Sequence, residues 1–148
     1  MKLSENFSLH EMTFSPTAIK KGILNKPSDE HIENMRILCE KVLQPLRDHM
    51  GCTINISSGY RAAALNLIIG GSKTSQHCFG QAADLQVQGR NHEIFKFIKD
   101  NLEFDQLIWE FGTDAEPSWV HVSFNAKHNR KQVMKAIKVK GKTQYVKV

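Results

Sequence analysis

The chain has 148 residues, which suffices for one domain with a substantial core and leaves too little for two. Its 41% apolar and 24% charged residues are ordinary for a globular protein, and no apolar run approaches the roughly 18 residues that cross a bilayer. The first residues also lack the charged-then-apolar pattern of a secretory signal. We therefore expect synthesis in the cytoplasm, with any work outside it depending on another exit route.

The three cysteines are an odd number and show no CxxC spacing, which argues against a disulfide framework and against a cysteine-rich zinc site. Cys39 and Cys52 are expected to be small core residues. Cys78 adjoins His77 and is a weaker candidate ligand, because the side chains of neighbouring residues point in different directions.

The net charge of +5 is spread unevenly along the chain. Residues 127–148 contain eight Lys or Arg and no acid, whereas the preceding 126 residues carry a net charge of −3. Lysines on an edge hairpin prevent pairing with other sheets, and this is the simpler interpretation. The alternative is attraction to a polyanion. Nucleic acid is disfavoured, because Tyr145 is the only aromatic residue in the segment and a single-strand platform needs several.

Two short helices are predicted within residues 1–28, where they wrap over the main body. Ser8 and Glu11 form a capping-box pattern, and Ser15-Pro16 with Gly22 marks a second start and stop. The longest helix follows from Asp29 to His49, and Pro45 is expected to bend or shorten it. Its buried face is set by apolar residues at three- and four-residue steps, namely Ile32, Met35, Cys39, Val42 and Leu46.

The remaining pattern alternates short strands and short helices without a regular βαβ rhythm, which indicates an α+β fold. We expect one domain over residues 1–148, with a central antiparallel sheet, a long N-terminal helix and a basic C-terminal strand pair at 127–148. The predicted elements are strand Thr53–Ser57, helix Arg61–Ile68 ended by Gly70-Gly71, strand Ala82–Val87, helix His92–Asn101 capped by Asn91, strands Asp105–Phe111 and Trp119–Phe124, and a hairpin turning at Lys140-Gly141-Lys142.

Two histidines and an aspartate are the candidate metal ligands. His77 and Asp84 are seven residues apart, so they converge only if a loop carries the first and a strand the second. His121 lies in an alternating strand, on the face opposite Val120 and Val122. Two imidazoles and a carboxylate suit zinc with one position left for water. A hydrogen-bonded core histidine is the alternative, because buried polar groups need partners.

The flanks of these residues form further motifs, namely Ser58-Gly59-Tyr60-Arg61, Asn66, Gly70-Gly71-Ser72, Ser75-x-His77-x(6)-Asp84 and Trp119-Val120-His121-Val122. Together these motifs resemble those of the zinc D-alanyl-D-alanine carboxypeptidases and murein endopeptidases, which share the hedgehog-like D,D-peptidase fold, and most of all their small phage-type variant. The resemblance extends to Phe7-Ser8-Leu9-His10-Glu11-Met12 and to Val42-Leu43-Gln44-Pro45-Leu46-Arg47, so it covers nearly the whole chain.

The resemblance implies that His77, Asp84 and His121 bind one zinc ion. It gives Arg61 the role of holding the substrate carbonyl oxygen, where negative charge develops. Ser75 and Tyr60 are candidate substrate contacts, and the alternative for Ser75 is a hydroxyl that caps its loop.

One position departs from the family pattern. Many relatives have an acidic general base three residues before the last histidine, and here that residue is Ser118. The favoured replacement is Glu110, which would share a face with His121 if the two strands paired with these residues opposite each other. Glu116 is the second candidate.

The resemblance thus predicts a zinc peptidase that cleaves peptidoglycan stem peptides with water as the nucleophile. We expect this enzyme to be a monomer. The basic end would hold the enzyme on an anionic wall polymer. Such an enzyme would reach the wall after release by another route, such as a phage holin, or as part of a phage particle. A non-catalytic phage structural or wall-binding module that retains the fold is the alternative. The sequence leaves open whether the bond cut is D-Ala-D-Ala, a cross-link or L-Ala-D-Glu.

Overall fold

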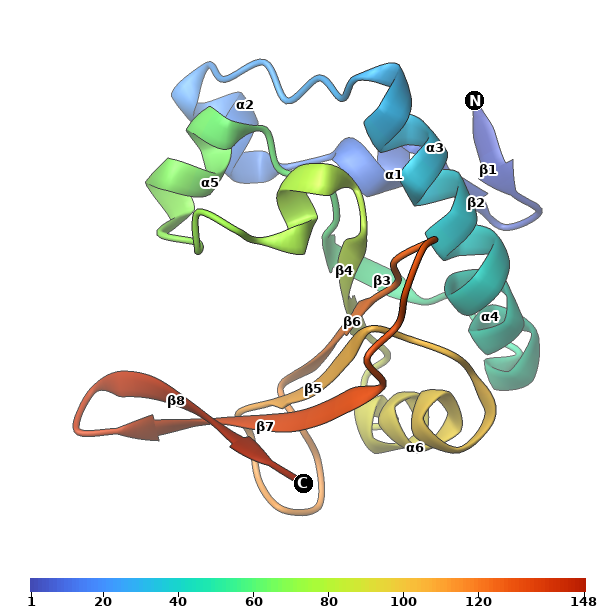
Figure 1. Cartoon of the computed structure of the whole chain (residues 1–148), viewed down its shortest axis with the longest axis vertical. Helices are drawn as coiled ribbons and strands as arrows, with labels where there is room; N and C mark the ends of the chain where they lie inside the picture. Colours follow the sequence, from blue (N-terminus) through green and yellow to red (C-terminus); the bar gives the residue numbers. More distant parts are fainter.

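A six-stranded sheet runs through the molecule in the order β3-β4-β6-β5-β7-β8 (Figure 1). The computed structural model describes residues 1–148. The strands are β3 Asn55–Ser58, β4 Ala82–Gln86, β5 Gln106–Glu110, β6 Trp119–Ser123, β7 Gln132–Val139 and β8 Lys142–Lys147. The α+β class and the C-terminal strand pair agree with the sequence prediction.

The sheet is mixed, so the expectation of a purely antiparallel sheet is wrong at one pair. β7 runs parallel to β5, with Gln132 opposite Gln106. Parallel neighbours need a crossover, and here β6 and the loop after it supply one. The start of β7 is fixed beside the start of β5 because Lys131 N–H donates to the Phe104 carbonyl and Gln132 N–H to the Asp105 carbonyl.

The longest helical segment covers residues 29–50, close to the predicted range. It is not N-terminal, because two strands and two helices come before it: β1 Lys2–Ser4, β2 Phe7–Ser8, α1 Leu9–Thr13 and α2 Pro16–Lys21. The segment comprises α3 Asp29–Leu38, the π-helical turn Cys39–Leu43 and α4 Gln44–Met50. Of its predicted buried face, all but the half-buried Ile32 are fully buried.

Pro45 does not end this helix. A proline has no N–H to donate to the carbonyl four residues earlier. The helix widens into the π-helical turn immediately before Pro45, where Gln44 N–H donates to the Cys39 carbonyl five residues back. The chain then continues helically to Met50, and Gly51 ends it in the left-handed conformation.

The two N-terminal helix signals are confirmed. Ser8 Oγ accepts from Glu11 N–H at 3.2 Å, and the Glu11 carboxylate accepts from Ser8 N–H at 3.2 Å. Ser15 caps α2, which Gly22 ends at a φ of 67°. These caps fix the short helices that precede α3.

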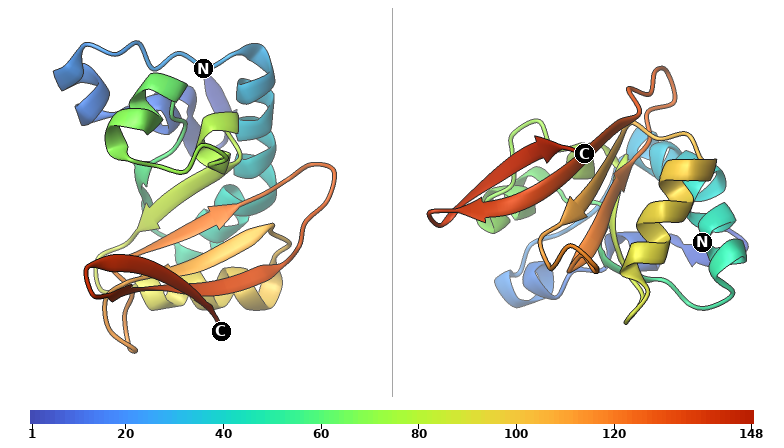
Figure 2. Two further views of the ribbon diagram at one scale, coloured as in Figure 1. Left: turned by 60° about the vertical axis from the view of Figure 1, so that its left-hand side comes forward. Right: turned by 90° about the horizontal axis from the view of Figure 1, so that it is seen from below.

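Alternation along the strands divides the sheet into an apolar face and a polar face. Ala83, Leu85, Leu107, Val120 and Val122 belong to the buried core. Helix α6 (Asn91–Asn101) packs against β4, β5 and β6 and also meets α4, so helices cover the apolar face (Figure 2). No helix has the length and apolar content to cross a bilayer.

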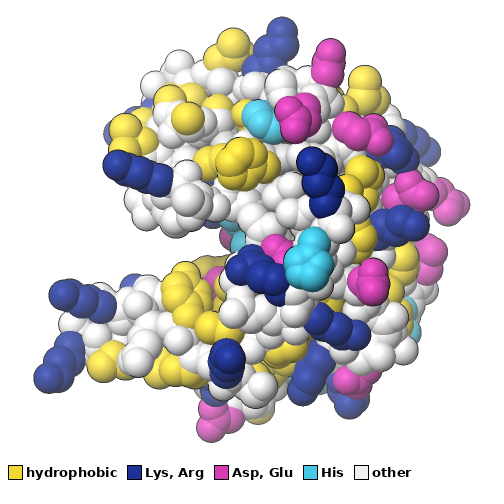
Figure 3. All heavy atoms as spheres, in the orientation of Figure 1, with side chains coloured by type: hydrophobic (Ala, Val, Ile, Leu, Met, Phe, Trp, Pro, Cys, Tyr) yellow, Lys and Arg dark blue, Asp and Glu magenta, His cyan; other side chains and the backbone are white.

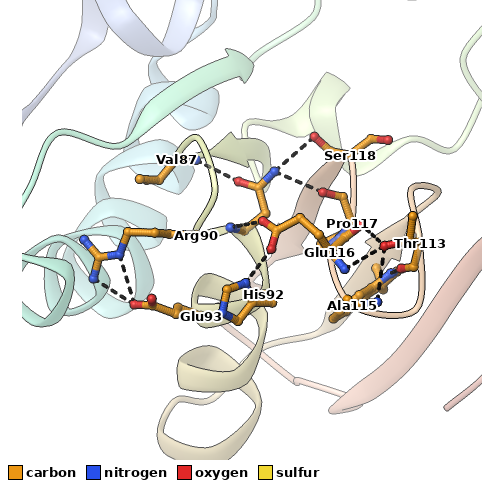
Figure 4. Close-up of polar contacts among 11 residues, drawn as sticks. Val87, Arg90, His92, Glu93, Thr113, Ala115, Glu116, Pro117 and Ser118 are labelled. Carbon is orange, nitrogen blue, oxygen red and sulfur yellow. Dashed lines mark hydrogen bonds and ion pairs between the residues drawn. The ribbon is translucent and has the colours of Figure 1, made fainter.

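Asn91 does not cap α6 as expected. The cap position is Arg90, and Asn91 is the first helical residue. Its side chain instead accepts from Val87 N–H at 2.8 Å and donates to the carbonyls of Pro117 and Ser118, both at 3.1 Å (Figure 4). Asn91 therefore ties the loop before β6 to the end of β4.

Candidate metal centre

A cleft of about 790 Å³ opens on the polar face of the sheet. One wall is the loop after α5 (Ala63–Ile69) together with the 3₁₀ turn Gln76–Phe79, and the other comes from β5, β7 and β8. Figure 3 shows the cleft as a deep recess between the upper part of the molecule and the projecting β7–β8 ribbon. His77, Asp84, Glu110 and His121 line it.

The three predicted ligands converge inside this cleft. His77 comes from the 3₁₀ turn, Asp84 from β4 and His121 from β6, and Asp84 and His121 are direct partners in the β4–β6 pair. Asp84 Oδ1 lies 3.1 Å from His121 Nδ1 and 3.4 Å from His77 Nε2. One donor atom from each residue lies within 4.8 Å of the others, so the three can contact one ion.

The orientation of His77 is fixed through its second nitrogen. His77 Nδ1 lies 2.7 Å from the Gly59 carbonyl, which can only accept, so Nδ1 carries the proton and Nε2 is left free toward Asp84. Ser75 Oγ accepts from His77 N–H at 3.3 Å and caps the turn that carries the ring. A histidine whose outer nitrogen donates to a carbonyl is typical of metal sites.

The protonation states also suit a metal site. Burial lowers the pKa of His77, despite the opposing charge of Asp84. Burial alone would raise the pKa of Asp84, but His77 and His121 outweigh it and hold that pKa far below its usual range. A neutral imidazole and an ionised carboxylate are the forms that bind metal.

Arg61 points into the cleft beside the ligand cluster. Its Nη2 lies 3.7 Å from Asp84 Oδ2, its Nε donates to Ser58 Oγ at 3.1 Å, and its Nη1 donates to Asn66 Oδ1 at 3.3 Å. A methyl group at Gly71 would lie 2.1 Å from Asn66 Oδ1 and 3.0 Å from Arg61 Nη1. Glycine at this position thus leaves room for the bond between Asn66 and Arg61.

Glu110 lies in the cleft with only 6% of its surface exposed. Burial raises its pKa to about 7; among nearby charges, His121 and Arg61 lower this pKa and Asp84 raises it. No hydrogen bond from the protein engages its carboxylate, so its proton is available for exchange with a molecule in the cleft.

In the β5–β6 pair, Glu110 lies opposite Trp119 and Ile108 lies opposite His121, so the expected direct opposition of Glu110 and His121 is wrong. The shift is two residues, and Glu110 therefore stays on the face that carries His121.

Glu116 is engaged elsewhere. Its Oε1 accepts from Asn91 N–H at 2.5 Å, and its Oε2 meets His92 Nδ1 (Figure 4). Both partners lie in the first turn of α6, where a carboxylate suits the helix dipole. Glu116 does not line the cleft, which favours Glu110 between the two candidate bases.

The other predicted site residues differ in where they lie relative to the cleft. Ser75 lines the cleft and also caps the turn, so both interpretations of its hydroxyl remain compatible with its position. Tyr60 is 6% exposed, belongs to the core and packs against His31 at 5.2 Å between ring centroids. It does not line the cleft, which gives substrate contact by Tyr60 no support. Cys78 is not part of the ligand cluster.

Sequence reasoning assigned no role to several residues of the site. Asn66 was a motif residue only, yet it donates to the Ser72 carbonyl at 2.9 Å while holding Arg61. Lys138 and Tyr145 line the cleft from the ribbon. Their alternation on β7 and β8 was visible, but no pattern showed that this face meets the cleft.

The α+β fold brings two histidines, an aspartate and a buried glutamate together in one cleft. This arrangement is consistent with a metallopeptidase. The model of the peptidase M15 family matches residues 5–123, and the chain belongs to this family. The resemblance seen in the motifs is thereby confirmed for the family and its hedgehog-like fold. Among curated proteins no match is found.

Proposed function

We propose that the protein is a zinc peptidase that hydrolyses an amide bond in peptidoglycan stem peptides. The observation that carries this proposal is the convergence of His77, Asp84 and His121 beside Glu110 in an M15 peptidase. A purely structural trio would have no need of an unpaired buried carboxylate next to it.

The residues present fit zinc. Two imidazoles and one carboxylate form a three-residue set that leaves a coordination position open, as catalytic zinc sites require. The donor set and the Gly59 carbonyl behind His77 match such a site. When bound, zinc would polarise the substrate carbonyl and lower the pKa of water.

The protein's own groups supply the proton transfers and charge stabilisation. Glu110 lines the cleft without a hydrogen-bond partner, so it is suited to accept a proton from the attacking water and return it to the leaving amine. Arg61 stays charged and offers several donors, so it stabilises the negative charge that develops on the carbonyl oxygen. Asn66 and Ser58 hold its guanidinium in place.

The substrate class and setting are part of the same proposal. The family implies a stem peptide, in which the bond cleaved is D-Ala-D-Ala, a cross-link or L-Ala-D-Glu. The protein would act as a monomer on the cell wall, outside the cytoplasm, in a phage or a phage-derived context. Its eight basic residues after Ala126 would attract it to anionic wall polymers.

The test begins with metal content, measured by elemental analysis after dialysis against metal-free buffer. We expect about one zinc per chain from the three-ligand site. His77→Ala should lose the zinc, whereas His10→Ala, at an exposed position, should keep it. Zinc-loaded protein is then incubated with purified muropeptides, and the products are identified by mass spectrometry.

One observation keeps a second function in view. Ser118 replaces the acidic residue that many relatives have, which suits a non-catalytic wall-binding module that retains the fold. Zinc binding without cleavage of any muropeptide would favour that module. A folded protein that neither retains nor takes up zinc would remove the peptidase mechanism.

A further inference from the structure

The β7–β8 ribbon forms a wall of the cleft although it lies beyond the part of the chain that the family model matches. The match ends at Ser123, the last residue of β6. The ribbon nevertheless contributes five lining residues, namely Gln132, Met134, Lys138, Thr143 and Tyr145. The residues that form this wall therefore lie outside the matched part of the chain.

Strand register explains why these side chains face the cleft. Glu110 lies beside Ala136, and Ala136 lies beside Tyr145, so the three share one face across β5, β7 and β8. Lys138 is two residues beyond Ala136 and opposite Thr143, which places it on that same face. Glu110, the proposed general base, and Lys138 thus belong to one continuous surface.

Lys138 is the one permanent cation in the cleft without an acidic partner. Arg61 lies beside Asp84, and Arg130 binds Asp105 through Nε and Nη2, both at 2.9 Å. Lys138 Nζ instead donates to Thr143 Oγ1 at 3.2 Å and lies 5.3 Å from the Phe111 ring centroid. These neutral contacts hold the ammonium group and leave donors free, since an ammonium has three.

We propose that Lys138 binds a free carboxylate of the peptide substrate and that the ribbon thereby sets which peptides are cleaved. The inference rests on the proposed function for its substrate class. Stem peptides carry a carboxylate at the C-terminus and another on the γ-linked D-Glu residue, and either can pair with an ammonium group. An ion pair formed at the cleft wall improves binding without taking part in bond cleavage.

General attraction of the basic ribbon to acidic molecules is the competing explanation. Lys142 provides the matched control, because it sits on the same ribbon, pairs with Val139, is exposed and does not line the cleft. A charge effect of the whole ribbon would act equally through Lys138 and Lys142. A specific carboxylate site would act through Lys138 alone.

The experiment measures binding by calorimetry on the zinc-loaded chain carrying Glu110→Gln, which slows turnover. The probes are the pentapeptide L-Ala-γ-D-Glu-L-Lys-D-Ala-D-Ala and two derivatives, one amidated at the C-terminus and one at the D-Glu carboxyl. We expect Lys138→Ala to raise the Kd of the free-acid peptide about tenfold, a typical value for one charged contact. Lys142→Ala should leave it unchanged. Amidation of the recognised carboxyl should abolish the difference between Lys138→Ala and its parent, which identifies the group bound.

Three results would overturn the inference: equal Kd values for Lys138→Ala and its parent, equal losses in Lys138→Ala and Lys142→Ala, or no binding of any peptide. Cleavage by the chain with Glu110 restored is followed in parallel. Cleavage that is insensitive to Lys138→Ala removes the inference and leaves the proposed function standing. Binding that depends on Lys138, without any cleavage, removes the peptidase activity and leaves the carboxylate site.

Discussion

Glu110 stands opposite Trp119 in the β5–β6 pair, two residues along from the point where His121 stands opposite Ile108. Because side chains alternate along a strand, this spacing puts Glu110 and His121 on one face of the sheet. The neighbouring strand β7 places the small, fully buried Ala136 beside Glu110. The result is a carboxylate that is shielded from bulk water while it still lines the cleft.

Glu110→Gln should lower kcat on a muropeptide by about 10²–10⁴-fold, the range for loss of a general base. The amide keeps the shape of the side chain but cannot take the proton, so zinc content and the unfolding transition should stay the same or improve. Rates are followed by separation of the products.

Glu116→Gln is the matched control for this prediction. It weakens the contacts to Asn91 N–H and His92, which should cost about 1 kcal/mol of stability, while the rate stays close to that of the unaltered chain. An inactive Glu116→Gln beside an active Glu110→Gln would reverse the assignment of the base.

Stability of the metal-free protein should depend on pH through Glu110. The folded pKa of about 7 lies above the ordinary value of 4.5, so the folded state holds the proton more tightly and loses stability as the pH rises between these values. Glu110→Gln removes this loss. The variant should therefore be more stable than the unaltered chain by about 3 kcal/mol at pH 8, and nearly equal to it at pH 4.5. Denaturant unfolding with a chelator present measures both; equal stabilities at pH 8 would contradict the burial of this charge.

Much of the site could be predicted from the sequence because the ligands lie in short motifs. Loop-borne His77 and strand-borne Asp84 converge as expected, and β6 presents His121 on the polar face. The exact partner of Glu110 could not be predicted, since register depends on the length and shape of the 111–118 loop. The conclusion that Glu110 and His121 share a face of the sheet still holds, because side chains alternate along a strand and a two-residue shift keeps the same face.

The fold was less predictable where contacts are distant in sequence. Nothing in the basic strands showed that β7 would pair in parallel with β5, because that pairing depends on the loop after β6 and on Arg130 binding Asp105. The helix continues through Pro45 because it widens into a π-helical turn just before that residue, and helix propensity alone does not predict such a turn. Tyr60 was assigned to the substrate from its motif, whereas tertiary packing buries it against His31.

Gly71→Ala should reduce kcat/KM while leaving zinc content unchanged. The added methyl group would lie 2.1 Å from Asn66 Oδ1 and must displace the side chain that holds Arg61. Loss of one group that stabilises the developing oxyanion typically costs about 10²–10³-fold in rate. Because Arg61 is displaced and not deleted, the loss of kcat/KM in Gly71→Ala should lie at or below the lower end of that range. Ser72→Ala, in the same loop, should keep nearly full activity, since its hydroxyl bonds only to Thr74. An active Gly71→Ala with normal kcat/KM would show that Asn66 does not position Arg61.

Asp105→Asn should destabilise the protein by about 2–3 kcal/mol at neutral pH, because this carboxylate is 4% exposed and accepts charged donors. It receives Arg130 Nε, Nη2 and N–H and also Gln76 Nε2, so it joins the start of the ribbon to the turn that carries His77. The hydrogen bonds from Arg130 hold the pKa of Asp105 below its ordinary value of 3.8.

Because the folded pKa is lowered, the stabilisation by Asp105 is present above about pH 4 and is lost as the pH falls through the folded value. The difference in the free energy of unfolding between Asp105→Asn and the unaltered chain should therefore be largest at pH 7 and become smaller below pH 4. Asp114→Asn is the control, because Asp114 is 98% exposed and pairs only with Lys135, so its removal should cause no measurable change. A gap for Asp105→Asn that persists undiminished at pH 3 would show that shape rather than charge holds the ribbon in place.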